Sequence, residues 1–408
     1  MISSNARYWI WLTIVLGYNT NKINRLYELY DDIAEFCQGG EEEWRFCGIF
    51  TSAELKKLRT VKIHEADKII SRCEEIGYSI VCIDDKAYPE CLRNIYASPA
   101  VLYVEGTLPD IDNILSIGIV GTRRASSYGT NNAYKFGYAL SKCGVIIVSG
   151  GALGVDCASH RGSLAAKGRT VCVLGCGINY NYLADNKGMR DAITKDGAVI
   201  SEYPPDTPPI GYQFPARNRL IAALSDGVLI IESGSKSGSL ITANLALEMG
   251  KELFALLGNN SPQNEGSNAR IKEGTAIPVT DFMDILSSFD NIYIDEEVKD
   301  IDSLNFMDIE EIPVKGVKTS KSEKPKPKAE ESKPAEAKPE HKRDLKLEGD
   351  MKKVYEFLSA EPVHIDEIAA RLYLPVFKVS VALTQLQIMG VVGAEPGRRF
   401  FVKAIPHN

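Results

Sequence analysis

Short apolar runs and segments with helical spacing alternate along the middle of the chain, from about residue 107 to about residue 285. The apolar runs are mostly β-branched, as expected for strands that are buried on both faces of a parallel sheet. We predict these strands at Ser116–Gly121, Val145–Ser149, Thr170–Leu174, Ala198–Ser201, Gly227–Glu232 and Leu253–Leu257. We predict helices between them at Gly129–Lys142, Leu153–Lys167, Lys187–Lys195, Asn218–Leu224 and Ser239–Gly250. The alternation is typical of a doubly wound α/β sheet, whose ligands bind at the carboxyl ends of the strands.

The sequence before this sheet has a different pattern. Residues 1–105 are rich in Leu, Ile, Tyr and charged residues, and they show helical spacing at Lys22–Glu35 and Thr51–Ile76. We therefore predict an N-terminal helical domain over residues 1–105 and a sheet domain over residues 106–290.

Residues 291–347 have the composition of a linker, and from about residue 314 Lys, Pro, Glu and Ala dominate. We predict that this last part is disordered, because it has too few apolar residues to bury. A solvated spacer is the favoured interpretation, and DNA contact by its lysines is the alternative. Hydrophobic periodicity returns over residues 348–408. Three helices and two strands there predict a winged helix-turn-helix, with elements at Met351–Ser359, Ile365–Leu372, Val376–Met389, Val391–Ala394 and Arg399–Val402.

Composition narrows the class of protein. The net charge of −7 excludes a uniformly basic nucleic-acid coat, although residues 115–275 hold 16 Lys and Arg against 12 Asp and Glu. Nine scattered cysteines without a CxxC pair indicate a reducing compartment rather than a disulfide scaffold or a zinc ribbon. The apolar run Tyr8–Leu16 is too short to span a membrane and lacks signal-peptide features. We therefore expect a cytoplasmic protein with no membrane partner.

Four glycine-rich loops follow four of the predicted strands. They are Gly121–Gly129, Ser149–Asp156, Ser201–Asp206 with its continuation Phe214–Arg219, and Glu232–Leu240. Glycine lets the backbone approach a ligand closely, and the N-terminus of a helix presents free N–H groups to an anion. One such loop alone is most simply a tight turn, but four at one edge of a sheet favour a ligand that carries phosphate.

Three arginines on these loops could hold phosphate oxygens with their planar donor groups, namely Arg123, Arg217 and Arg219. The alternative for Arg217 and Arg219 is an internal salt bridge to Glu202 or Glu232, each of which ends a predicted strand.

The loops do not match the best-known nucleotide motifs, and a catalytic constellation is not evident. The sequence has no Walker A pattern and no GxGxxG fingerprint. His160 is interpreted as structural or ligand-contacting, and Asp156 as a helix-start residue. We therefore expect a protein that is not an enzyme and that needs no cofactor or metal.

The ordered set of motifs resembles the bacterial DNA-processing protein A family, DprA or Smf. The motifs are GTRRASSYG (121–129), SGGALGVD (149–156), SEYPPDTPP (201–209), FPARNRLIA (214–222) and SGSLITANLALEMG (237–250). The resemblance implies an extended Rossmann-like, mostly parallel sheet. It also implies an N-terminal helical domain of the SAM or helix-hairpin-helix kind and a C-terminal winged helix.

The resemblance further implies a homodimer that binds single-stranded DNA, protects incoming DNA and loads the RecA recombinase during natural transformation. The family's DNA pocket corresponds here to Arg123, Ser126, Gly150, Gly151, Gly154, Lys187, Phe214, Arg217, Asn218, Arg219, Ser237, Gly238 and Ser239. Bases could stack on aromatic residues such as Phe214, Tyr203 or Tyr212, for each of which core packing is the alternative.

Two other functions compete with this one. The segment from Ser237 to Glu248 distantly resembles the nucleotide-binding motif of phosphoribohydrolases, in which a glutamate helps to cleave the glycosidic bond. The winged helix could instead belong to a transcriptional regulator. Because its predicted recognition helix Val376–Met389 is mostly apolar, partner binding is favoured over reading of an operator.

Overall fold

The computed structural model comprises two compact units, residues 1–319 and 320–408. It describes residues 4–289, 304, 306–309, 349–359, 362–372, 374, 376–389, 391–395 and 399–402. Most of the predicted linker, including all of its part from residue 314, lies outside these residues. No helix in the described part of the chain is both long and apolar enough to cross a membrane.

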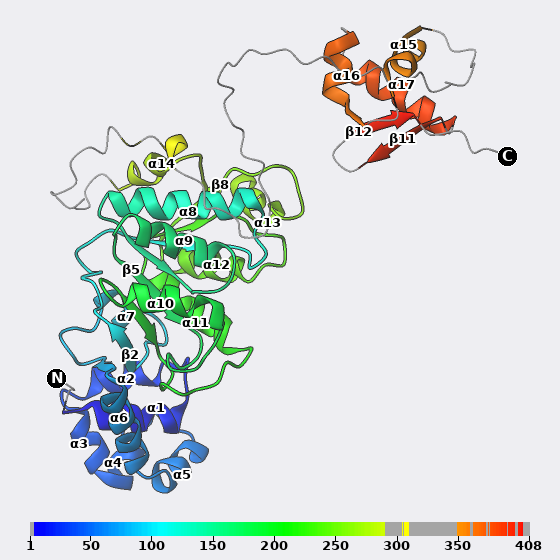
Figure 1. Cartoon of the computed structure of the whole chain (residues 1–408). Helices are drawn as coiled ribbons and strands as arrows, with labels where there is room; N and C mark the ends of the chain where they lie inside the picture. The colour runs from blue at the N-terminus through cyan, green and yellow to red at the C-terminus, as the bar shows by residue number, and fades with distance from the viewer. Residues whose placement is uncertain are drawn as a thin grey trace. The chain divides into compact units, whose positions relative to one another are not determined.

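The larger unit is built on one nine-stranded sheet, ordered β1-β2-β6-β5-β4-β3-β7-β8-β9 (Figure 1). The strands are β1 (Ser79–Cys82), β2 (Val101–Gly106), β3 (Ser116–Val120), β4 (Ile146–Ser149), β5 (Thr170–Leu174), β6 (Ala198–Ser201), β7 (Gly227–Ile230), β8 (Glu252–Leu256) and β9 (Ile277–Val279). All neighbours from β6 to β9 pair in parallel, whereas β2 pairs antiparallel with both β1 and β6. The predicted doubly wound, mostly parallel sheet is therefore confirmed.

Helices cover both faces of this sheet. They are α8 (Ser127–Lys142), α9 (Val155–Ala165), α10 (Lys187–Ile193), α11 (Gln213–Ala223), α12 (Ser239–Glu248), α13 (Glu265–Lys272) and α14 (Phe282–Leu286), with a short 3-10 turn at Ala184–Asn186. Alternate residues of β7 belong to different cores, because successive side chains of a strand point to opposite faces. Val228 and Ile230 pack with α11 and α12, whereas Leu229 packs with α8 and α9. A 3-10 turn at Phe306–Asp308 returns to α8, where the Phe306 ring lies 4.8 Å from that of Phe136.

The N-terminal helices gather at one end of this unit (Figure 1). They are α1 (Ala6–Leu16), α2 (Lys22–Leu29), α3 (Ile33–Gln38), α4 (Gly40–Phe46), α5 (Ser52–Thr60) and α6 (His64–Ile76). The predicted helical stretch Lys22–Glu35 is divided, because the Asp32 side chain accepts a hydrogen bond from the backbone of Ala34 and caps α3. Residues 79–106, which the sequence pattern groups with these helices, supply β1 and β2 to the sheet.

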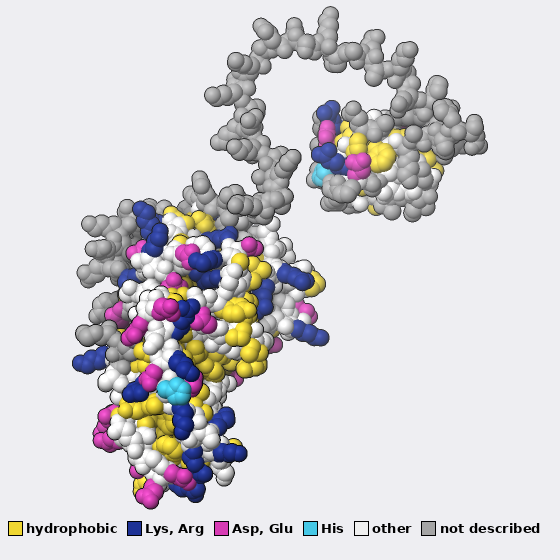
Figure 2. Space-filling model, turned by 60° about the horizontal axis from the view of Figure 1, so that its bottom comes forward, with side chains coloured by type: hydrophobic (Ala, Val, Ile, Leu, Met, Phe, Trp, Pro, Cys, Tyr) yellow, Lys and Arg dark blue, Asp and Glu magenta, His cyan; other side chains and the backbone are white. Residues whose placement is uncertain are grey.

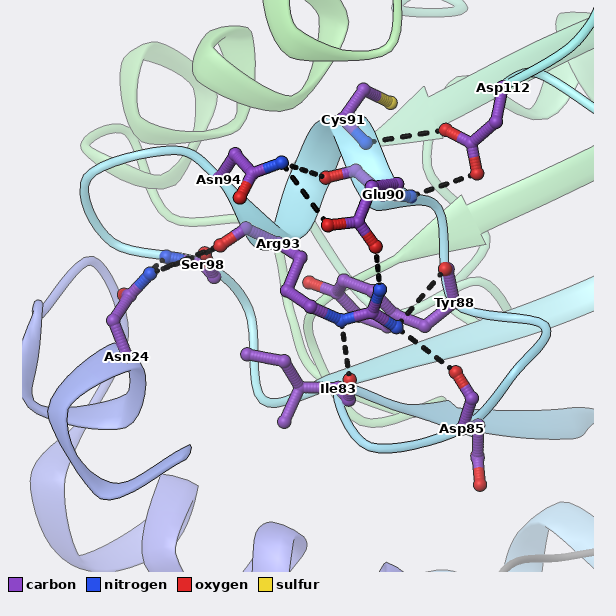
Figure 3. Close-up of polar contacts among 10 residues, drawn as sticks. All are labelled: Asn24, Ile83, Asp85, Tyr88, Glu90, Cys91, Arg93, Asn94, Ser98 and Asp112. Atoms are coloured by element: carbon purple, nitrogen blue, oxygen red, sulfur yellow. Dashed lines mark hydrogen bonds and ion pairs between the residues drawn. The ribbon is translucent and has the colours of Figure 1, made fainter. Parts of the chain in front are cut away.

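Arg93 fastens the segment that joins β1 to β2 (Figure 3). It ends the short helix α7 (Glu90–Arg93), pairs with Glu90, and stacks over the rings of Tyr27 and Tyr88 at 5.7 and 5.5 Å. Its guanidinium also donates hydrogen bonds to the carbonyl oxygens of Ile83, Asp85 and Tyr88. One side chain thus holds together the first half of this segment, residues 83–93.

Asn24 of α2 connects this segment to the N-terminal helices (Figure 3). Its side-chain amide donates to the carbonyl of Ile95 at 2.9 Å and to the hydroxyl of Ser98 at 2.7 Å. Its side-chain oxygen accepts from the backbone N–H of Ser98 at 3.0 Å. Because both ends of the amide are used, Asn24 fixes the turn at residues 95–98 relative to α2.

The smaller unit is the predicted winged helix. Its elements are α15 (Gly349–Phe357), β10 (Val363–His364), α16 (Ile365–Leu372), α17 (Val376–Ile388), β11 (Val392–Glu395) and β12 (Arg399–Val402). The strands form an antiparallel sheet ordered β10-β12-β11. Side chains such as Leu358, Ile368 and Leu383 form a separate core.

We expect Asn24→Ala to lower the free energy of unfolding of the larger unit by about 1–3 kcal/mol, because it removes the hydrogen bonds to the 95–98 turn and leaves the buried backbone N–H of Ser98 without its partner. The three tryptophans lie at positions 9, 11 and 44, so fluorescence during urea unfolding reports on the N-terminal helices. Asn113→Ala, which removes only an exposed hydrogen bond to Asp110, is the control. Equal unfolding midpoints for the two variants would contradict the role given to Asn24.

Candidate nucleic-acid interface

A cavity of about 200 Å³ opens at the carboxyl edge of the sheet. It lies where the loops after β3 and β7 meet, which is the point at which the strand order reverses direction and ligands of such sheets bind. Seven of the residues predicted for the DNA pocket line it, namely Arg123, Phe214, Arg217, Asn218, Ser237, Gly238 and Ser239. The fold thus brings together residues that are more than 110 positions apart in the sequence.

Arg123 and Phe214 form the aromatic and cationic part of this cavity. The exposed guanidinium of Arg123 lies over the Phe214 ring, 5.4 Å from its centroid. The ring of Tyr182 packs on Phe214 at 5.2 Å. A cation and an aromatic ring are therefore presented side by side, and both are components of sites that bind nucleotides.

Arg217 lies deeper, and its side chain is held by the backbone of neighbouring loops. Only 4% of the residue is exposed, and its guanidinium donates to the carbonyl oxygens of Gly150, at 2.8 Å, and Val173. A Cβ atom on Gly150 would lie 2.6 Å from this guanidinium, so a larger residue there would displace Arg217 from its present position. Burial lowers the pKa of Arg217, and the neighbouring Asp156 opposes this effect.

Asp156 is the acidic partner of this buried arginine. It accepts a hydrogen bond from the backbone N–H of Ala152 at 3.4 Å and lies in the wall of the cavity. Burial raises the pKa of this carboxyl, whereas Arg217 acts in the opposite direction. Asp156 therefore both shapes the second loop and partly balances the charge of Arg217.

The glycines of the second loop allow it to pack against its neighbours. Gly154 has a φ of +77°, and a Cβ atom there would lie 2.4 Å from the carbonyl oxygen of Thr122 in the first loop. Gly151 also has a positive φ, of +63°, and is buried beside Cys172. Glycine at these two positions therefore lets the second loop pack closely against the first loop and against β5.

The fourth loop supplies hydroxyl groups and the N-terminus of α12. The hydroxyls of Ser237 and Ser239 lie 2.8 Å apart, and Ser239 also bonds to Ser233 at 3.0 Å. The side chain of Asn218 reaches the carbonyl of Gly238 at 3.4 Å. A row of hydroxyls at the start of a helix is suited to an anionic ligand.

Besides the three glycines of the second loop, three predicted site residues do not line the cavity. Ser126 caps α8, and its hydroxyl donates to the buried carboxylate of Glu232 at 2.5 Å. Lys187 is exposed on α10 and pairs with Asp191 at 3.1 Å. Arg219 is buried and pairs with Glu202, which is the internal salt bridge weighed as an alternative above.

The two tyrosines considered for base stacking also differ in environment. Tyr203 is 1% exposed and belongs to the core, whereas Tyr212 is 69% exposed at the start of α11. Sequence reasoning missed Tyr182, although its neighbour Phe214 was recognised. It also missed two exposed basic residues, Arg124 and Lys236, which stand within the first and fourth loops and were visible as the second arginine of GTRR and the lysine of SGSKSGS.

Charge on one face of the larger unit is mixed rather than concentrated. On the face shown in Figure 2, Lys and Arg side chains of the larger unit alternate with Asp and Glu, and apolar side chains gather in a patch between them. This face therefore offers a polyanion no continuous row of basic side chains.

Comparison with known proteins assigns the family. The family model for DNA recombination-mediator protein A matches residues 79–290, and that for the DprA winged helix domain matches residues 326–398. The chain belongs to the DprA family.

Individual DprA relatives agree with this assignment. The DNA processing protein DprA of Bacillus subtilis is 40% identical over 192 residues, which cover 47% of this chain and 65% of the relative. Protein Smf of Synechocystis is 33% identical over 326 residues and 78% of each chain. The X-ray structure of DprA from Streptococcus pneumoniae superimposes with a TM-score of 0.62 at 30% identity, over 71% of this chain and 99% of that one.

His160, one turn after Asp156 on α9, makes stability depend on pH. Its Nδ1 lies 2.8 Å from the Thr170 hydroxyl, which itself donates to a backbone carbonyl, so the imidazole is the donor to Thr170. Burial, and then the positive charge of Arg217, lowers the pKa of His160 from 6.5 to about 3. The unfolded chain takes up a proton below about pH 6.5 while folded His160 stays neutral, so its contribution to stability is lost as the pH falls toward 3.

We expect wild-type protein to lose about 2 kcal/mol more stability than His160→Gln between about pH 7 and about pH 5. Urea unfolding of both proteins at the two pH values measures the difference, in which all other titrating groups cancel. Parallel losses in the two proteins would show that His160 is not held neutral.

Proposed function

We propose that this protein binds single-stranded DNA at the cavity, without chemical reaction, and acts in recombination. The observation that carries the proposal is the joint presence of Arg123 over Phe214, the hydroxyls of Ser237 and Ser239, and the N-terminus of α12. The cation, the hydroxyls and the helix N-terminus suit phosphate, and the aromatic ring suits a base. The names of the curated relatives, which describe DNA processing, support the same substrate class.

The aromatic ring in the cavity favours a single strand over a duplex. Stacking on Phe214 requires a base whose face is free, which in a duplex is covered by its neighbours. The binding should be largely independent of sequence, because every base has such a face.

Membership of the DprA family supports the finer parts of the proposal. We propose that the protein forms a homodimer in the cytoplasm, protects incoming single strands and loads RecA onto them during natural transformation. The division into an N-terminal helical domain, a sheet domain, a linker and a winged helix is part of the same proposal.

The winged helix is proposed to bind a protein partner rather than an operator. The described exposed positions of α17 include Lys378, Val381 and Gln385, and Met389 follows the helix directly. Val381 and Met389 are 56% and 44% exposed. Apolar side chains interleaved with single polar ones suit a protein surface better than the edges of bases.

The phosphoribohydrolase alternative is disfavoured by the position of Glu248. This residue ends α12, about 9 Å along the helix axis from Thr242, the last residue of that helix in the cavity wall. It lies instead in a separate groove with Tyr96 and Lys251. A glutamate so placed cannot reach a nucleotide in the cavity.

We expect Arg123→Ala to weaken binding to an oligothymidylate and to reduce the slope of log affinity against log salt by about one, because one phosphate contact is lost. The melting temperature should stay nearly unchanged, since the guanidinium is exposed. Fluorescence anisotropy with a salt titration provides both quantities, and the same titration with blunt duplex should give weaker binding.

Arg45→Ala is the matched control, because it removes an equally charged, exposed side chain of α4. Equal losses of affinity in the two variants would show that only net charge matters. Equal affinity of the wild type for single strand and duplex would contradict the proposed function itself.

A further inference from the structure

Arg219 and Glu202 form a buried ion pair behind the cavity. The guanidinium meets both carboxylate oxygens, at 2.9 and 2.7 Å, and the two side chains are 7% and 2% exposed. Burial disfavours the charged form of Arg219, but Glu202 outweighs it, so the pKa of the guanidinium is raised. A pair buried in this way is stable in one geometry only, because either partner alone would be an uncompensated charge.

Helix α11 faces two sites at once. Phe214, Arg217 and Asn218 line the cavity, whereas Arg219 points to the opposite side. Two residues along an α-helix correspond to a rotation of about 200°, so Arg217 and Arg219 cannot face the same ligand. The contacts that hold Arg219 therefore also fix the rotation of α11 about its axis. This rotation determines the direction in which Phe214, Arg217 and Asn218 point.

Arg219 also contacts a strained turn. Its Nε donates to the carbonyl oxygen of Ala97 at 3.1 Å. Ala97 has a φ of +106°, which side-chain-bearing residues rarely adopt and which costs about 1–3 kcal/mol. The next residue, Ser98, is held by Asn24 of α2. The turn is thus held by a hydrogen bond from Arg219 of α11 and by a hydrogen bond to Asn24 of α2.

The N-terminal region also closes over the ion pair. Tyr203 follows Glu202, and its ring packs at 4.5 Å on that of Tyr18 in the connection between α1 and α2. Tyr18 and Asn19 line a small pocket together with Glu202 and Arg219. A contact with DNA would require Arg219 to leave both Glu202 and Ala97.

From these contacts we infer that Arg219 and Glu202 are positioning residues of the DNA site, which hold α11 in its binding orientation against the N-terminal helices. Arg219 itself makes no contact with DNA. The inference rests on the proposed function and adds that residues 1–76, through Asn24 and Tyr18, support the cavity without touching the nucleic acid.

Salt-dependent titrations separate a positioning residue from a phosphate contact. Glu202→Gln should lower the affinity for an oligothymidylate about tenfold, although it removes a negative charge, because the ion pair that orients α11 is broken. Arg219→Gln should cause a similar loss, and in both variants the salt slope should equal that of the wild type. Glu41→Gln, which makes the same charge change in an exposed pair on α4, should bind like the wild type.

Tighter or unchanged binding by Glu202→Gln would overturn the inference, as would a salt slope reduced by about one in Arg219→Gln. If a single variant fails to fold, the double variant Glu202→Leu/Arg219→Met replaces the pair with apolar side chains, a change that buried pairs often tolerate. It still lacks the bond to Ala97 and should show the same loss, so binding at wild-type affinity would also overturn the inference. Wild-type protein in the same titrations separates a test of the proposed function from a test of this inference. If the wild type does not bind the oligothymidylate, the proposed function is rejected as well.

Discussion

Two guanidinium groups are buried on opposite sides of helix α11, and each needs partners inside the protein. Arg217 finds them in the carbonyl oxygens of Gly150 and Val173 and in the nearby Asp156. Arg219 finds them in Glu202 and Ala97. The helix can satisfy both only at one rotation, and at that rotation Phe214 and Asn218 line the cavity.

The repeated strand and helix pattern was enough to predict the parallel part of the sheet. All six strands from β3 to β8 were predicted within two residues at each end, because strands buried on both faces stand out as apolar runs. The three outer strands were missed. Strand β2 contains an apolar run over residues 101–104, but this run was grouped with the helical sequence before it. Strand β1 also stands next to helical sequence, and β9 is only three residues long.

The candidate site was predictable in outline but not in detail. Parallel strands bring the loops at their carboxyl ends to one edge, which is why seven of the thirteen predicted residues meet in one cavity. The direction of a side chain on a helix depends on how that helix rests on the sheet, and the sequence does not contain this information locally. Motif spacing therefore grouped Arg217 with Arg219, whereas packing separates them.

The central claim is that the cavity at the carboxyl edge of the sheet is where single-stranded DNA binds. Hydrogen–deuterium exchange of the full chain, with and without an oligothymidylate, tests it most directly, since it reports on every loop at once. The account predicts slower exchange in the loops around Arg123, Gly151, Phe214 and Ser237, with blunt duplex giving a weaker effect at the same concentration. Protection confined to the winged helix, with these loops unchanged, would contradict it.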